Sequence, residues 1–183
     1  CRETLLRLER RMTELERLGK ELAKPKKMEK AFIKELPAVV VASHRRVVRG
    51  YDELFDLCPN VIGPEMARLG CECSEPGYCF TIDHTCEFRE RDIDIEYCEA
   101  VTERKEESEL IEFKELEAVP TAVCMYHRGN YDTLPQTFAE LYAYVEKEGY
   151  KLAGSPRFSY IDGIWNKDSE EERLTEIQIP AGR

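Results

Sequence analysis

The sequence predicts an α+β fold made of a duplicated unit of strand, helix, strand and strand, preceded by a separate N-terminal helix. Three observations predict it. A residue pattern returns after 80 positions, strand patterns with a period of two end both copies, and a narrow apolar seam runs through residues 5–22. The first copy is expected at residues 30–101 and the second at 110–181.

In the N-terminal seam, an apolar residue recurs every three or four positions, while Arg, Glu and Lys fill most other positions. A helix with this narrow stripe, ending near Pro25, can pack on its own domain or pair with another helix. We favour a dimerising coiled coil over residues 1–25. The chain opens at Cys1 inside this pattern, and we therefore expect a further segment upstream. The seam consists of Leu5, Leu8, Met12, Leu15, Leu18 and Leu22.

The first copy starts with a Val-rich candidate strand over residues 32–48, interrupted by Pro37. A helical stretch follows, which Pro59 and Pro64 are expected to break up before it stops at Gly70. Two short strands, at residues 78–82 and 92–101, complete this copy, and a charged linker over residues 102–109 follows it.

The second copy repeats these residues in one register over more than sixty positions, which chance rarely produces. We infer a duplication from this agreement. The matched positions are 34–36 with 114–116, Tyr51 and Asp52 with Tyr131 and Asp132, Pro76 with Pro156, and Glu96 with Glu176.

The helix of the second copy has the clearer pattern. Its apolar residues form one stripe that predicts the buried face, and Gly149 stands at a plausible left-handed cap. The stripe consists of Leu134, Phe138, Leu141, Tyr142 and Val145.

The last strand, residues 174–180, places Ile177 and Ile179 on one face, which we expect to be core, and Glu176 on the other. The opposite face is either solvated or lines a cleft. The single Trp of the chain, Trp165, lies shortly before this strand. Phe158 and Tyr160 precede it, and in a hairpin their rings would stand beside Glu176.

Composition limits the function. The net charge of −10 disfavours a grip on nucleic acid by residues 1–183, so any DNA contact is expected from an upstream head. No run of about eighteen apolar residues exists, and no secretory signal is recognisable. We expect a cytoplasmic protein that does not enter membranes.

Four of the eight cysteines crowd together near His84, which permits a zinc site, disulfides or reduced thiols. The spacing is too tight in one pair and too wide in the other for the usual zinc knuckle. We therefore favour reduced, partly buried thiols and predict no metal. The four are Cys71, Cys73, Cys79 and Cys86.

Residues 30–181 resemble the GyrI-like effector-binding domain found in AraC-type and MerR-type transcription regulators. The resemblance rests on Arg128 to Asp132, on Gly154 to Arg157 with Tyr160, and on the terminal strands 92–96 and 174–180. The N-terminal seam is similar to the dimerisation helix of MerR-type proteins. The resemblance implies an antiparallel sheet with two helices and a pseudo-two-fold axis. It also implies a homodimer joined through the N-terminal helix.

The resemblance further implies a groove between the copies that receives a small-molecule effector and requires no cofactor. The acid that matches the family's central acid is Glu176. An aromatic groove with one carboxylate favours aromatic or cationic organic ligands, because ring faces attract cations. This implies multidrug sensing as a function. The expected ligand-binding residues are Glu176, Tyr160, Trp165, Phe158, Tyr78, Phe80 and Glu96.

Two other functions stay open. Some relatives of this module resemble hydrolases, in which Glu176 would act as general base while Tyr160 or Trp165 positions the substrate. No Ser-His-Asp set supports another hydrolytic mechanism, and His127 is expected to be structural. An acidic module that sequesters another protein is the third hypothesis.

Overall fold

The structure, a computed structural model, describes residues 30–85 and 91–183. The predicted dimerisation helix, residues 1–25, and Cys86 lie outside the described residues.

The first half contains two strands before its helical segment instead of one. Pro37 separates them, because it cannot donate to a strand ladder. The elements are β1 (Phe32–Leu36), β2 (Val39–Val48), α2 (Tyr51–Leu57), η1 (Cys58–Ile62), α3 (Gly63–Arg68), β3 (Cys79–Asp83) and β4 (Ile93–Ala100).

The helical stretch of the first half runs without a gap from residue 51 to residue 68, but it is divided into α2, η1 and α3, as its two prolines predicted. Pro59 and Pro64 stand in the first turns of η1 and α3. Between them the chain forms one wide π-type turn. The stretch ends at Gly70, whose φ of 68° is the left-handed conformation that glycine adopts without strain.

The second half repeats this order of elements. It likewise has two strands before its helix, and the predicted hairpin follows the helix. The elements are β5 (Glu112–Leu116), β6 (Val119–Arg128), η2 (Tyr131–Thr133), α4 (Leu134–Lys147), β7 (Lys151–Leu152), β8 (Arg157–Asp162), η3 (Glu170–Glu172) and β9 (Leu174–Gly182).

The long strands form one curled antiparallel sheet in the order β1-β6-β9-β8-β3-β4-β2-β5. β1 of the first half pairs with β6 of the second, and β5 of the second half pairs with β2 of the first. The first strand of each half therefore pairs with the second strand of the other half. This exchange explains why a short strand precedes each long one.

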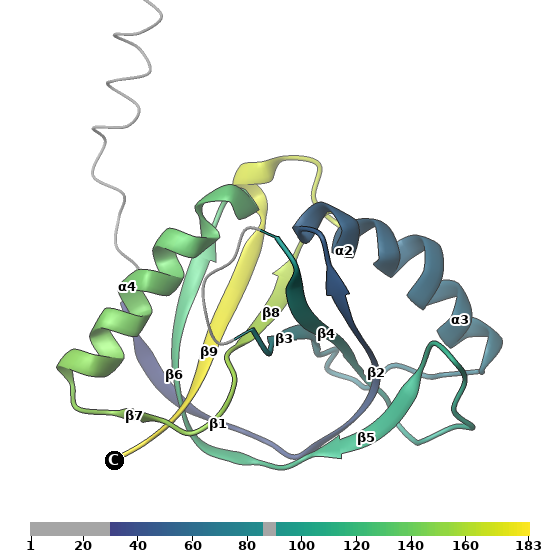
Figure 1. The fold of residues 1–183 in the computed structure, drawn as a ribbon, viewed down its shortest axis with the longest axis horizontal. Helices are drawn as coiled ribbons and strands as arrows, with labels where there is room; N and C mark the ends of the chain where they lie inside the picture. Colours follow the sequence, from purple (N-terminus) through teal and green to yellow (C-terminus); the bar gives the residue numbers. More distant parts are fainter. Residues whose placement is uncertain (1–29, 86–90) are drawn as a thin grey trace, which may run out of the picture.

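Both helical segments lie on the same side of the sheet (Figure 1), with α4 near β6 and α2 near β2. α4 packs its predicted stripe onto the sheet: Leu134, Leu141 and Val145 are buried there with Ile177 and Ile179. Phe138 is partly buried against this core, whereas Tyr142 is 37% exposed, so the predicted helix face is confirmed except at Tyr142. The prediction of the core face of the last strand is confirmed.

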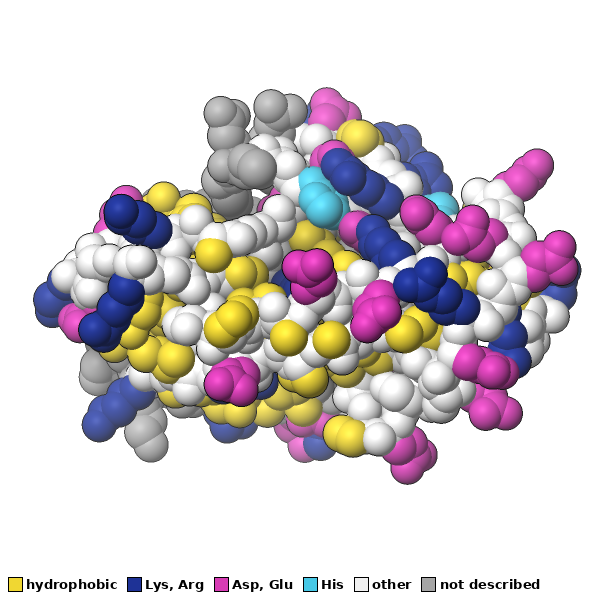
Figure 2. Space-filling model, turned by 90° about the horizontal axis from the view of Figure 1, so that it is seen from below, with side chains coloured by type: hydrophobic (Ala, Val, Ile, Leu, Met, Phe, Trp, Pro, Cys, Tyr) yellow, Lys and Arg dark blue, Asp and Glu magenta, His cyan; other side chains and the backbone are white. Residues whose placement is uncertain are grey.

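The side of the molecule away from the helices carries acidic and basic side chains in alternation, with hydrophobic ones between them (Figure 2). No large region of a single sign stands out on this face. An electrostatic footprint for nucleic acid would require such a region of positive charge.

The core of α4 gives a direct test of this packing. Leu141 is fully buried, so Leu141→Ala leaves a cavity and is expected to lower the free energy of unfolding by about 2–5 kcal/mol. Gln136→Ala, at an exposed position of the same helix, should change it by less than about 0.5 kcal/mol. Urea denaturation measures both. Equal effects would contradict the packing described.

Candidate functional site

A cavity of about 710 Å³ lies between the first helical segment and the sheet. Leu54, Phe55 and Cys58 line it from α2 and η1, and the strands β3, β4 and β8 form its floor. The wall is mainly apolar and aromatic, as in pockets that bind small organic molecules.

The loop after β8 covers one side of this cavity with Ile164 and Trp165. Its turn is held by Asn166, whose Oδ1 accepts from the Gly163 N–H at 2.9 Å. The Trp165 ring lies over Gly163 so closely that a Cβ there would meet the ring at 2.2 Å. Glycine is therefore required for the indole to reach this position, where it remains 57% exposed.

One carboxylate, Glu99 on β4, lines the cavity. Its Oε2 accepts a hydrogen bond from the Tyr97 hydroxyl at 2.9 Å, and the Tyr97 oxygen accepts one from the Cys79 thiol at 3.3 Å. Burial raises the pKa of Glu99 by more than the hydrogen bonds from Tyr97 and Cys79 lower it. Within residues 30–85 and 91–183, no Lys, Arg or His forms an ion pair with Glu99.

Three of the seven residues expected at the ligand site line this cavity: Tyr78, Tyr160 and Trp165. The Tyr160 hydroxyl also makes a buried hydrogen bond of 3.2 Å with Thr81 Oγ1. Phe158 lies on the helix side of the sheet but packs in the α4 core, with its ring 5.7 Å from that of Phe138.

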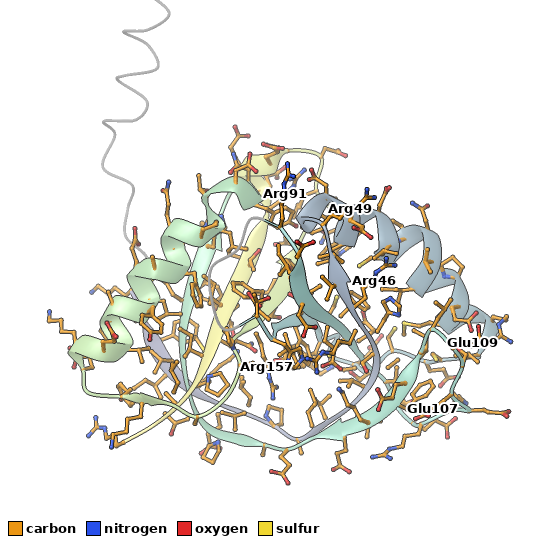
Figure 3. The ribbon with its side chains drawn as sticks, in the orientation of Figure 1. Arg46, Arg49, Arg91, Glu107, Glu109 and Arg157 are labelled. Atoms are coloured by element: carbon orange, nitrogen blue, oxygen red, sulfur yellow. The ribbon has the colours of Figure 1, made fainter. Side chains whose placement is uncertain are left out.

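The other residues expected at the site lie on the face of the sheet away from the helices. Phe80 is buried there, stacked on Tyr78 at 4.2 Å. The Arg157 guanidinium lies 5.3 Å from the centre of the Phe80 ring, and Figure 3 shows Arg157 within the curl of the sheet. The Tyr78 hydroxyl donates to Gln178 Oε1 at 2.5 Å, so Tyr78 reaches both the cavity and this face.

Glu176 also lies on this second face, and it does not line the cavity. Its carboxylate is buried, forms an ion pair with Lys34 and accepts a hydrogen bond of 2.8 Å from Gln178 Nε2. The predicted β8–β9 hairpin does form, but its register pairs Glu176 with Ser159. Because side chains alternate between faces, the rings of Phe158 and Tyr160 point to the other side.

Glu96 has the corresponding surroundings in the first half. It forms an ion pair with Lys114, and its Oε2 lies 2.8 Å from His84 Nε2. Burial by itself would raise the pKa of Glu96, but the hydrogen bonds from Lys114 and His84 outweigh burial and hold it below the usual value. Each half thus supplies the lysine for the other half's buried carboxylate.

Sequence reasoning missed Glu99, Tyr97 and Phe55. One signal was present: the offset of 80 matches Glu99 with Ile179, which is buried in the core. Because Ile179 packs in the core of the second half, an acid at the matching position, Glu99, indicates that this face of β4 is partly covered but not filled by side chains.

The remaining candidates are His127 and the cysteines of the described residues. His127, as expected, is buried at a strand end, with its ring nitrogens 2.8 Å from Thr137 Oγ1 and the Asn130 carbonyl oxygen. Cys71, Cys73 and Cys79 are free thiols. In the part of the chain that the structure describes, no three His, Cys, Asp or Glu are grouped to hold a metal, and no helix is long and apolar enough to cross a membrane.

The fold and the apolar cavity with its single acid define a domain that binds small molecules. The sequence model of the GyrI-like small molecule binding domain matches residues 30–181, and the chain belongs to this family. The predicted resemblance is thereby confirmed. A comparison with curated protein sequences finds no match.

Solved structures agree with this assignment. The EcmrR C-terminal domain is 40% identical, with a TM-score of 0.81 over 85% of this chain and 98% of that one. EcmrR in a DNA complex is 38% identical, with a TM-score of 0.82, and this chain covers 70% of it. SAV2435 bound to tetraphenylphosphonium shares the fold at 12% identity, with a TM-score of 0.51 over 84% of this chain and 94% of that one.

The ion pairs Lys34–Glu176 and Lys114–Glu96 join the two halves, and we expect the Glu96 pair to make the free energy of unfolding depend on pH. Because the pKa of Glu96 is below its unfolded value of about 4.5, the ion pair stabilises the protein above that pH, and this contribution is lost as the pH falls through the lower folded pKa. Glu96→Gln should lower the free energy of unfolding by on the order of 2 kcal/mol at pH 7. Below pH 4 the difference should shrink.

Urea denaturation between pH 3 and pH 7 measures this effect. Glu115→Gln, which alters an exposed carboxylate beside Lys114, is the control and should follow the wild type. A difference between Glu96→Gln and wild type that stays constant with pH would contradict the prediction.

Proposed function

We propose that this chain is the effector-binding domain of a bacterial transcription regulator of the MerR type, and that its effector is an aromatic or bulky organic cation. The family assignment and the similarity to EcmrR, which has been solved on DNA, support a regulator. In this proposal the cavity beside α2 receives the effector.

The observation that carries the proposal is the difference between three sheet carboxylates. Glu96 and Glu176 each have a lysine partner, whereas Glu99 lines the cavity and has no basic partner among the described residues. An unpaired carboxylate in apolar surroundings is costly. A cation that enters the cavity supplies the missing charge.

The rings around the cavity suit a cation that carries apolar groups. Phe55, Tyr160 and Trp165 line this space, and Tyr78 borders it while its ring stacks on Phe80. A cation over a ring face gains about 0.5–2 kcal/mol. Shape and charge therefore contribute more to selection here than a pattern of hydrogen bonds.

The hydrolase hypothesis has less support. Glu176, its general base, is already bonded to Lys34 and Gln178. It also lies across the sheet from Tyr160, so the two side chains do not face a common substrate. A hydrolase from Listeria innocua shares the fold at 15% identity, which carries no activity to this chain.

The remaining parts of the proposal concern the whole regulator. We take residues 30–101 and 110–181 as the duplicated copies, residues 1–25 as the helix of a homodimer, and an upstream head as the DNA-binding part. Such a regulator works in the cytoplasm.

The role of Glu99 can be tested with tetraphenylphosphonium, a bulky cation with aromatic groups. Trp165 is the only Trp, so quenching of its fluorescence reports occupancy of the cavity directly. Glu99→Gln keeps the size and a hydrogen-bond acceptor but removes the charge. It should weaken binding about 10–100-fold, because a charged contact worth about 1.5–3 kcal/mol is lost.

Glu176→Gln is the matched control, and it also tests the sequence-based prediction for Glu176. It should reduce stability and leave the affinity within about threefold of wild type, because Glu176 faces away from the cavity. Strong loss of binding in Glu176→Gln with none in Glu99→Gln would assign the ligand to the opposite face of the sheet.

Trp165 gives an independent test. Trp165→Ala should weaken binding of the same cation about 3–30-fold in calorimetric titration, because one ring face of about 0.5–2 kcal/mol is lost. Trp165→Phe should recover most of the affinity. Leu152→Ala, at a similarly exposed residue away from the cavity, should bind like wild type. Binding unaffected by Trp165→Ala would exclude the loop from the site.

A further inference from the structure

Among the residues that the structure describes, the groups that line the cavity beside Glu99 include weak acids but no Lys, Arg or His. Tyr97 precedes it on the same face of β4, Cys79 faces it from β3, and Cys58 faces the cavity from η1. Cys73 lies in the segment before β3, and burial together with the nearby charge of Glu99 raises its pKa. Thiols and phenols are neutral at physiological pH, so none of these groups compensates a negative charge on Glu99.

The hydrogen bonds run in one direction along the cavity wall. The Cys79 thiol donates to the Tyr97 oxygen, and the Tyr97 hydroxyl donates to Glu99 Oε2. Burial raises the pKa of Cys79 and of Tyr97, which keeps both groups protonated and available as donors. Of these three hydrogen-bonded groups, the Glu99 carboxyl therefore changes its charge most readily.

The two lysines that neutralise the other sheet carboxylates are not available to Glu99. Lys34 and Lys114 pair with Glu176 and Glu96 on the opposite face of the sheet. Glu99 instead stands where the second half has Ile179, a core position, and it is half-buried. In the empty cavity, the simplest compensation for a carboxylate in these apolar surroundings is a proton.

We propose that a cationic effector replaces a proton on Glu99, so that the domain exchanges one proton for one cation and binds the cation less tightly as the solution becomes more acidic. The inference rests on the proposed function and adds its regulation. On binding, the O–H bond of the Glu99 carboxyl breaks and the proton passes to the solvent. No other group changes its charge.

The direction of the effect follows from linkage. Burial raises the pKa of Glu99 in the empty cavity, and a bound cation lowers it. When the pH is above the pKa of Glu99 in both the empty and the cation-bound state, no proton is exchanged and affinity is greatest. When the pH lies between these two pKa values, one proton leaves for each cation bound, and affinity falls tenfold for each unit of decrease in pH.

Tyr97 acts as a positioning residue in this exchange. Its hydroxyl donates to the ionised carboxylate and therefore favours the charged form. Tyr97→Phe removes this bond while keeping the ring. It should move the pH at which affinity begins to fall to a higher value, an effect that a purely structural role for Tyr97 would not produce.

The experiment uses tetraphenylphosphonium, which has no titratable group, so any proton exchanged comes from the protein. Calorimetric titrations between pH 5 and pH 8, in buffers with different ionisation enthalpies, give the affinity and the number of protons released. We expect release to approach one proton per cation at the acidic end. Glu99→Gln should bind weakly, with no proton release and an affinity independent of pH.

The outcomes separate this inference from the proposed function. Saturable binding that Glu99→Gln weakens, but that releases no proton and does not vary with pH, overturns the inference and leaves the proposed function standing. The same pH dependence in Glu99→Gln as in wild type assigns the proton to another group and also overturns it. No saturable binding at any pH overturns both.

Discussion

Every strand of a sheet sends alternate side chains to opposite faces, and this constraint determines the chemistry of this protein. On β4, Tyr97 and Glu99 face the cavity, while Glu96 faces the other side, where Lys114 meets it. Only three positions along β4 separate Glu96, which has a lysine partner, from Glu99, which has no basic partner in residues 30–85 and 91–183. A shift of one residue in the strand register would exchange these surroundings.

The crosswise exchange of first strands gives the two halves a shared structure. β1 brings Lys34 to Glu176, and β5 brings Lys114 to Glu96, so each buried carboxylate depends on the other half for its cation. Removing either lysine would leave the buried carboxylate of Glu176 or Glu96 without its lysine partner, which is costly for a charge shielded from water. These pairs link the two halves on the face of the sheet opposite the cavity.

On the helix side, aromatic rings join the halves instead of charges. Phe55 of α2 stacks on Tyr131 of the second half at 4.5 Å, and Tyr160 meets both rings edge-on at 6.2 and 5.9 Å. Phe55 and Tyr160 also line the cavity. A ligand that contacts these two rings touches the junction between the halves. It favours one arrangement of them only if it binds that arrangement more tightly.

The sequence by itself determined the order of helical and strand segments, most of the buried face of α4 and the core role of Ile177 and Ile179, because these follow from local periodicity. It did not separate β1 from β2. Its motifs also identified the family. Only the tertiary structure decided which face of the sheet carries the cavity, and so distinguished Glu99 from Glu176. That distinction depends on Lys34, which lies 142 residues from Glu176 in the chain and reaches it through β1. Periodicity assigns a residue to a face but contains no information about which distant side chain lies opposite it.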